Sequence, residues 1–363
     1  MQKDYILKKR DFISKKLDTS KLTEGKVKAK APSNIALVKY WGKKKNQIPT
    51  NTSISFTLSA CFTLTEMEFR LKNNSEKLAF DIFFDGKKQE DFKPKIHTFF
   101  KRIEKYVPFI SKYSFVINTR NSFPHSSGIA SSASGMAALA FCIMQMEKQL
   151  NPTISKDYFF KKASFLARLG SGSASRSVLD GIVVWGKHKK IKGSSNLYAV
   201  NFPYKVHPVF KNYHDTILLV DKGEKTVSST VGHQLMENHP FSKQRFKQAN
   251  KNSIKLKKIL KKGDLESFIN VTESEALTLH GLMMSSNPYF ILMKPNTLQI
   301  IQKIWKFRNT TNLPVSFTLD AGANVHVLYP EKYKKEINDF IVTELIEHCQ
   351  NKSYICDRVS WKE

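Results

Sequence analysis

The chain has 363 residues, of which 41% are hydrophobic and 12% aromatic, a composition that indicates one large or two medium globular domains with a substantial core. Lys and Arg number 59 against 31 Asp and Glu, so the formal net charge is +28. Such a surplus suggests a polyanionic ligand, such as nucleic acid, anionic lipid or a phosphorylated metabolite, although a Lys-rich solvated surface would give the same charge.

Neither a secretory nor a membrane-spanning segment is predicted. Residues 1–30 contain no apolar core of signal-peptide length, and no later segment reaches the roughly 18 to 20 apolar residues that span a bilayer. The four cysteines are too scattered for a paired-ligand metal site or a disulfide framework, which fits a reducing compartment. We therefore expect a cytoplasmic protein whose residues 1–26 form a basic, amphipathic or partly ordered extension.

Residues 27–59 combine two strand patterns with a cluster of lysines. A strand-like run leads into the sequence KYWGK, which begins at Lys39 and ends at Lys43, and polar and apolar residues alternate over 53–58, as in a half-buried strand. An aromatic pair flanked by lysines can form the wall of a pocket for an anionic group. Lysines beside a Gly turn are also common on solvated surfaces, so both interpretations stay open here.

Residues 121–140 read NSFPHSSGIASSASGMAALA, a small-residue loop that opens a helix. The first N–H groups of a helix lack intrahelical partners and lie at the positive end of its dipole, so a phosphate chain can bind there. The pattern favours a nucleotide triphosphate, but it is neither the Walker nor the dinucleotide motif, and a tight turn before a packed helix is the alternative. The candidate phosphate-binding residues are Ser126, Ser127, Gly128, Ser131 and Ser132.

A second serine-rich segment, ARLGSGSASRSVLDGIVVWGK, follows a helix predicted over 155–169. It places Arg176 among serines that include Ser171 and Ser173. A guanidinium binds a carboxylate or phosphate in two-pronged fashion, so this segment is a candidate anion cradle; a Gly/Ser turn with a surface Arg is the alternative. Other elements predicted in this half are strands over 63–71, 79–84, 113–119 and 181–185, and a helix over 94–105.

A domain boundary is predicted near residues 204–213, where Pro203 and Pro208 interrupt the pattern. It divides the chain into domains over 27–205 and 206–363. In the second domain, a strand over 216–220 precedes a loop that contains Ser229. A helix over 243–262 then carries nine Lys or Arg and no acid, which resembles a nucleic-acid-binding patch, but stacking aromatics and a recognition motif are missing, so a solvated helix face is favoured.

Asp320 stands at the end of an apolar strand predicted over 315–319, in the sequence TLDAGAN. A carboxylate at a strand reversal projects into whatever the reversal faces, although Asp is also common as a simple turn former. Helices are predicted on either side, over 296–308 and 331–349.

Four segments together resemble diphosphomevalonate decarboxylases of the GHMP kinase superfamily. They are APSNIALVKYWGK with IPTNTSIS, FPHSSGIASSASG, ARLGSGSASRS and TLDAGAN, in the family's order and with similar spacing over about residues 27–330. The resemblance implies an α+β GHMP kinase fold, with an N-terminal lobe like ribosomal S5 domain 2 and a ferredoxin-like C-terminal lobe around a deep cleft. It also implies that ATP with Mg²⁺ and mevalonate 5-diphosphate are bound, that isopentenyl diphosphate is formed, and that the protein is a homodimer that binds no nucleic acid.

By matching motif, Asp320 corresponds to the family's catalytic aspartate, and Arg176 with Ser171 and Ser173 to the residues that hold the substrate's anionic groups. The diphosphate end matches Lys39, Tyr40 and Lys43. A further substrate contact matches Ser229, and the ATP phosphate loop matches the residues from Ser126 to Ser132. Lys39 is also expected near the reacting phosphate.

The chain departs from the family pattern at Ala323, where Pro is frequent, and at Thr230, where some bacterial members have Arg. These departures affect substrate detail more than reaction class. Two rival functions stay open: a related enzyme that only phosphorylates its substrate or decarboxylates the monophosphate, and a nucleic-acid-binding protein.

Overall fold

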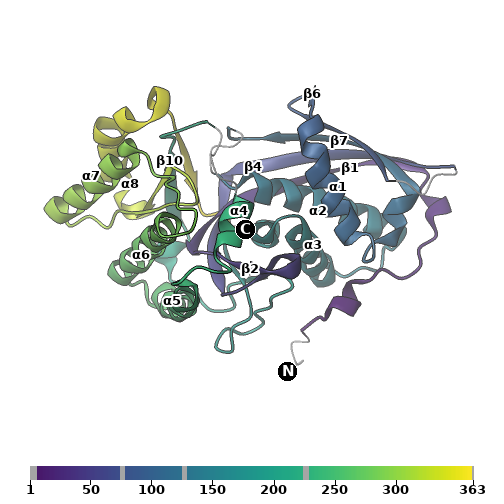
Figure 1. Ribbon diagram of the computed structural model, residues 1–363, viewed down its shortest axis with the longest axis horizontal. Coiled ribbons are helices and arrows are strands. Elements are labelled where there is room, and N and C mark those ends of the chain that lie inside the picture. Colours follow the sequence, from purple (N-terminus) through teal and green to yellow (C-terminus); the bar gives the residue numbers. More distant parts are fainter. Residues whose placement is uncertain (1–5, 74–77, 125–128, 224–228, 362–363) are drawn as a thin grey trace.

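The computed structural model describes residues 6–73, 78–124, 129–223 and 229–361 (Figure 1). Within these ranges the chain forms two larger β-sheets, a small hairpin and eight α-helices. The predicted α+β class is therefore confirmed.

The first sheet is built on two long antiparallel strands, β1 (Glu24–Val38) and β4 (Ser53–Leu71). The first half of β1 alternates exposed and buried residues, whereas every residue from Ser33 to Val38 is buried. The alternation stops because α5 (Ser242–Lys262) and α6 (Leu265–Met284) cover the second face of the strand at this end. The other strands are β5 (Ala79–Phe84), β6 (Lys87–Lys88), β7 (Tyr113–Asn121), β8 (Ile182–Trp185) and β9 (Val200–Asn201), and the separate hairpin consists of β2 (Lys43–Lys44) and β3 (Ile48–Pro49).

Three helices pack on one face of this sheet: α1 (Lys93–Ile103), α2 (Ser131–Leu150) and α3 (Lys156–Gly170) (Figure 1). Four residues of the N-terminal extension join the same core, namely Leu7, Phe12, Leu17 and Leu22. Phe12 is fully buried, and its ring stacks on that of Phe165 with centroids 4.3 Å apart. The described part of the extension is thus anchored through these apolar side chains, whereas most of its other residues are exposed.

The second sheet has the strand order β11-β12-β10-β13. Along the chain, β10 is followed by a helix-rich connection, then by β11 and β12, then by α8 (Lys334–Phe340) and finally by β13. This is the β-α-β-β-α-β order of a ferredoxin-like arrangement. Its strands are β10 (Tyr213–Leu218), β11 (Ser316–Thr318), β12 (Val325–Pro330) and β13 (Tyr354–Arg358), and the remaining helices are α4 (Ser229–Leu235), α7 (Pro295–Thr311) and α8 (Lys334–Phe340).

The two halves share a hydrophobic core. Ile35 and Phe56 from the first sheet pack in one cluster with Ile217, Leu256 and Phe268 from the second half. The ends of β1 and β4 therefore lie at the junction of the halves, which is where the motifs converge. The predicted deep cleft stays a prediction, because residues 125–128 and 224–228 lie outside the described part of the chain.

Three predictions about individual elements were wrong or incomplete. The strands predicted over 53–58 and 63–71 are one strand, β4, and α6 was not predicted at all. The C-terminal helix is interrupted: α8 ends at Phe340, and a π-helical turn (Ile341–Leu345) and a 3-10 turn (Ile346–His348) follow. Among the described helices, none is long and apolar enough to cross a membrane.

Candidate active site

The centre of the site is an ion pair between Lys39 and Asp320. Lys39 follows the last residue of β1, and Asp320 lies in the loop between β11 and β12. Their Nζ and Oδ1 atoms are 3.2 Å apart, with the Lys39 side chain 2% exposed and that of Asp320 30% exposed. Two motifs 281 residues apart thus meet, and the carboxylate keeps access to solvent or to a ligand.

The main chain around Asp320 is fixed by two hydrogen bonds. His280 Nε2 on α6 donates to the Asp320 carbonyl at 3.0 Å, and Thr297 Oγ1 on α7 donates to the Ala323 carbonyl at 2.7 Å. The turn is therefore tied to two helices without the Pro that is frequent in the family, so the departure at Ala323 leaves the Asp320 carboxylate in place.

Arg176 is buried beside this pair, on a 3-10 turn (Gly172–Val178) after α3. Its Nε donates to Asn34 Oδ1 at 3.1 Å and its Nη1 to Ser53 Oγ at 2.9 Å. Burial lowers the pKa of Arg176 to about 10, against the raising effect of the Asp320 charge. The guanidinium is oriented by neutral groups, so it keeps its positive charge for an anion.

Lys39 is the second buried cation of the site. Burial lowers its pKa, and the carboxylates of Asp320 and Glu275 act in the opposite direction. Together with Arg176 it makes a local excess of positive charge around Asp320, which is the environment that a substrate with several anionic groups requires.

The two serine-rich segments also meet. Ser131 is the first residue of α2, after Ala130 with φ 49°, and Ser132 Oγ lies 3.2 Å from Ser171 Oγ, which is 3.4 Å from Ser173 Oγ. Hydroxyl groups from the start of α2 thus border the segment that carries Arg176. The other predicted residues, Ser126, Ser127 and Gly128, lie outside the described residues, and Ser229 is described only as the first residue of α4.

Tyr40 and Trp41 form the predicted aromatic wall and are both buried. The ring of His233, on α4, packs at 4.4 Å from Tyr40 and 4.7 Å from Trp41, and its Nδ1 accepts the Gly42 N–H at 2.9 Å. Burial, then the charges of Lys43 and Arg176, lower the pKa of His233 to about 3. The imidazole is therefore neutral and acts as an acceptor for the main chain.

The hydroxyl of Tyr40 is buried and has no hydrogen-bond partner among the described residues. It faces Gly172, on which a Cβ would lie 2.6 Å from the Tyr40 oxygen. Only a glycine leaves room for this contact, so the KYWGK and GSGSASR motifs touch where the Tyr40 ring packs against Gly172.

Two family models match most of the chain. The diphosphomevalonate decarboxylase-like N-terminal domain matches residues 31–197, and the mevalonate 5-diphosphate decarboxylase C-terminal domain matches residues 216–361. The chain belongs to the diphosphomevalonate decarboxylase family. A diphosphomevalonate decarboxylase from Ganoderma lucidum is 31% identical over 332 residues, which cover 86% of this chain and 80% of that protein.

Solved structures of decarboxylases in this family share the fold. A mevalonate diphosphate decarboxylase from Staphylococcus aureus superposes with a TM-score of 0.78 at 28% identity, over 93% of this chain and 96% of that one. A structure of MDDEF in complex with MVAPP, AMPPCP and magnesium gives a TM-score of 0.79 at 28% identity, over 93% and 97% of the two chains. The predicted family and its fold are confirmed.

Several polar residues of this decarboxylase-family site were not predicted individually from the sequence. They share burial, and a buried polar side chain needs a partner, but of the six only His280 stands in an otherwise apolar run that could have signalled it. They are Asn34, Ser53, His233, Arg245, Glu275 and His280. Arg245 was counted in the basic helix, but it is buried, whereas the other cations of α5 are at least partly exposed and form the solvated face that the sequence favours.

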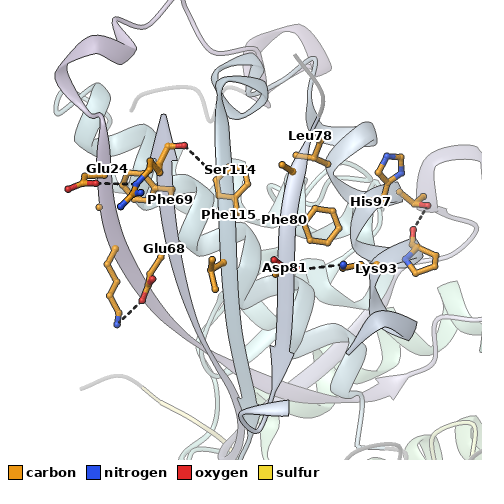
Figure 2. A pocket seen from close by; sticks show the side chains of 17 residues that line it. Glu24, Glu68, Phe69, Leu78, Phe80, Asp81, Lys93, His97, Ser114 and Phe115 are labelled. Carbon is orange, nitrogen blue, oxygen red and sulfur yellow. Dashed lines mark hydrogen bonds and ion pairs between the residues drawn. The ribbon is translucent and has the colours of Figure 1, made fainter. Parts of the chain in front are cut away.

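A hollow of about 1350 Å³ lies elsewhere, on the first sheet beside α1 (Figure 2). Its charged residues are paired with one another, as in Lys93 with Asp81 at 3.3 Å and Arg70 with Glu24 at 3.3 Å. None of the residues matched to the family motifs lines it. This hollow is therefore not the place where the motifs converge.

Proposed function

We propose that this chain catalyses the ATP-dependent decarboxylation of mevalonate 5-diphosphate to isopentenyl diphosphate, a step of isoprenoid biosynthesis by the mevalonate pathway. The main supporting observation is the carboxylate of Asp320, hydrogen-bonded to buried Lys39 and close enough to buried Arg176 for its charge to act on the guanidinium. Family membership supports the same reaction, since the related MDDEF was solved with MVAPP and AMPPCP.

The chemistry of the substrate explains why these groups are needed. A tertiary hydroxyl is a poor leaving group, so phosphoryl transfer from ATP first converts it into a phosphate. Loss of that phosphate develops positive charge at C3 while the neighbouring carboxylate leaves as carbon dioxide. Catalysis therefore needs a group at the hydroxyl, a cradle for the transferred phosphoryl group, and an anchor that aligns the carboxylate.

Asp320 is the proposed group at the hydroxyl. Its carboxylate orients or deprotonates the 3-hydroxyl and then stabilises positive charge at C3, two tasks that a partly exposed anion can perform. Lys39, 3.2 Å from Asp320 Oδ1, holds that carboxylate and balances charge as the phosphoryl group arrives.

Arg176 is the proposed anchor for the substrate carboxylate, with Ser171 and Ser173 beside it. Its two described hydrogen bonds, to Asn34 and Ser53, fix the plane of the guanidinium and so pre-organise it for two-pronged binding. We assign the diphosphate end to the unpaired hydroxyl of Tyr40 and to Lys43, and a further substrate contact to Ser229.

ATP is proposed to bind at the start of α2, through the residues from Ser126 to Ser132. The hydroxyl cluster formed by Ser132, Ser171 and Ser173 fits a phosphate chain at this helix terminus. In the described part of the chain, no group of three or more His, Cys, Asp or Glu could hold a metal ion. We therefore propose that Mg²⁺ is held mainly by phosphate oxygens of ATP, as is common for this ion.

The phosphate loop gives the first prediction. Gly128→Val should raise the Michaelis constant for ATP, because a branched side chain prevents phosphates from lying against the backbone. Steady-state kinetics with ATP as the varied substrate measure this effect. An unchanged Michaelis constant and turnover rate would show that the loop does not bind ATP.

The substrate class is tested by comparing mevalonate 5-diphosphate with mevalonate 5-phosphate at saturating ATP. We expect a higher kcat/KM for the diphosphate, because Lys43 and Tyr40 would contact its terminal phosphate. A preference for the monophosphate would instead assign the chain to phosphomevalonate decarboxylation.

We further propose a domain boundary at residues 205 and 206, a cytoplasmic location and a homodimer. The two family models support the boundary, since one ends at residue 197 and the other begins at 216. Light scattering on the purified protein tests the oligomeric state.

A further inference from the structure

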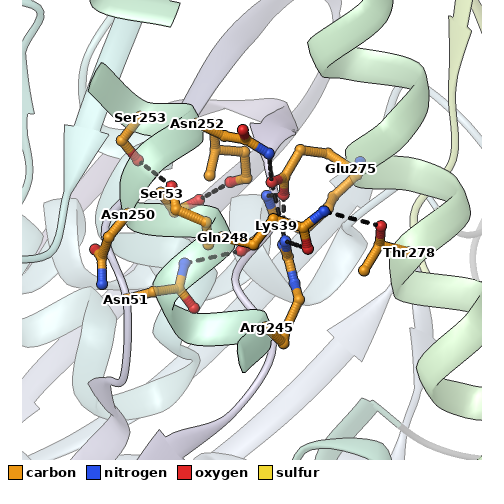
Figure 3. A network of polar contacts seen from close by, with 12 residues as sticks. Lys39, Asn51, Ser53, Arg245, Gln248, Asn250, Asn252, Ser253, Glu275 and Thr278 are labelled. Carbon is orange, nitrogen blue, oxygen red and sulfur yellow. Dashed lines mark hydrogen bonds and ion pairs between the residues drawn. The ribbon is translucent and has the colours of Figure 1, made fainter. Parts of the chain in front are cut away.

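A buried polar network centred on Glu275 lies directly behind Lys39 (Figure 3). Glu275, on α6, is fully buried. Its carboxylate accepts the Lys39 backbone N–H at 2.9 Å and Asn252 Nδ2 at 2.6 Å. Arg245, on α5 and also buried, makes a two-pronged ion pair with it, in which Nη1 is 2.9 Å from Oε1. Every oxygen of this carboxylate is therefore occupied.

The network fixes both polar groups of the Lys39 main chain. The N–H is held by Glu275, and the carbonyl accepts Asn51 Nδ2 at 3.0 Å. Lys39 lies one residue beyond the end of β1, so side chains replace the strand partners that a buried backbone requires. The acceptor comes from a residue 236 positions away in the second half of the chain.

An ion pair at this depth is weak evidence for a role in stability, since apolar residues often replace such pairs without loss. The Glu275 pair differs from a general stabilising pair because one of its acceptor oxygens is used by the backbone of the lysine that contacts Asp320. Small displacements of reacting groups have large effects on rate. The location of the pair therefore points to catalysis.

We propose that Glu275 is a positioning residue: by accepting the Lys39 N–H, its carboxylate sets where the Lys39 ammonium meets Asp320. Arg245 compensates the buried negative charge and holds the carboxylate in that orientation. The inference rests on the proposed function for its kinetic readout only.

Two double variants separate positioning from packing. Arg245→Met/Glu275→Leu removes the ion pair and the acceptor, whereas Arg245→Met/Glu275→Gln removes the ion pair but keeps an amide oxygen that can accept the Lys39 N–H. We expect turnover of the Leu double variant to be at least about tenfold below that of the Gln double variant. ATP affinity should be the same in both. Equal turnover in the two would overturn the proposal.

Glu273 provides a matched control on the same helix. It is also buried and pairs with Arg308, at 2.6 Å between Oε1 and Nη1, but it faces α7 instead of Lys39. Glu273→Gln should lower the melting temperature and leave turnover near that of the wild type. The contrary result would be that turnover falls in proportion to the melting temperature in Glu273→Gln and in the Glu275 variants alike. Glu275 would then be a packing residue only.

Glu275→Asp covers the case in which the Leu double variant does not fold. It keeps the negative charge near Arg245 but withdraws both carboxylate oxygens by one methylene, and with them the acceptor of the Lys39 N–H. Turnover should again fall at least about tenfold with ATP affinity retained. Wild-type turnover in a folded Asp variant would contradict the proposal.

Hydrogen–deuterium exchange at the Lys39 amide gives a readout that does not depend on activity. Exchange should be faster in Glu275→Asp and in the Leu double variant than in the Gln double variant, because only the last keeps the acceptor in reach. Unchanged exchange would overturn the inference even in an active enzyme. A wild type without ATP-dependent carbon dioxide release would defeat the proposed function, and the exchange comparison would still decide the role of Glu275.

Discussion

Asp320→Asn should lower turnover by at least about a hundredfold while the protein stays folded, because general-base contributions are typically about 10²- to 10⁴-fold. The substitution preserves the shape of the side chain but removes the negative charge that would orient or deprotonate the 3-hydroxyl and stabilise C3. The Asp320 main chain is held through its carbonyl by His280, so the turn should survive. A thermal melt, an ATP titration and steady-state kinetics on one preparation measure these effects.

The turn interpretation of Asp320 predicts a different result. A turn former contributes roughly 0.5 to 1.5 kcal/mol through hydrogen bonds that Asn can still accept, so activity would persist. Asp264 is a suitable control, since its Oδ1 accepts the Ser267 N–H at 3.0 Å to cap α6. Asp264→Asn should leave turnover unchanged. If a folded Asp320→Asn enzyme turned over at the wild-type rate, Asp320 would be a turn residue only.

Arg176→Lys should lower kcat/KM at least about tenfold, since hydrogen bonds to charged groups contribute about 1.5 to 3 kcal/mol and an ammonium cannot reproduce two-pronged binding. Lys would also lose one or both contacts that Arg176 makes with Asn34 and Ser53. The loss should appear with mevalonate 5-diphosphate as the varied substrate and leave ATP binding unaffected.

Arg308 offers a control of the same chemistry in a structural setting. It makes a two-pronged contact with Glu273 at 2.6 and 3.1 Å, so Arg308→Lys should reduce stability and spare kcat/KM. Wild-type efficiency in a correctly folded Arg176→Lys enzyme would remove Arg176 from the site.

Local patterns in the sequence predicted most elements because their periodicity reflects one buried face. The strand over 79–84 coincides with β5, and the helix over 243–262 differs from α5 by one residue. Where two faces are buried, the period is lost: α6 is apolar on several sides and was missed, although Asp264 supplies an N-cap signal that could have located it. The small residues around Ser59 and Ala60 hid the continuity of β4.

The site was predictable in its parts but not in its geometry. The motifs named Lys39, Arg176 and Asp320, and the structure brings their side chains together. The residues that orient them were not predicted as partners, because Glu275 and Lys39 are joined only through the fold and lie 236 positions apart. Contacts of this kind depend on how α5 and α6 pack against the end of β1, and no local pattern records that packing.

The most direct test of the proposed reaction is the yield of carbon dioxide from carboxyl-labelled mevalonate 5-diphosphate, measured together with ADP from the same reaction. We expect carbon dioxide and ADP in equal amounts, isopentenyl diphosphate as the product, and no carbon dioxide without ATP. ADP formed without carbon dioxide would identify a kinase that stops after phosphoryl transfer and would contradict the decarboxylase mechanism proposed for Asp320, Lys39 and Arg176.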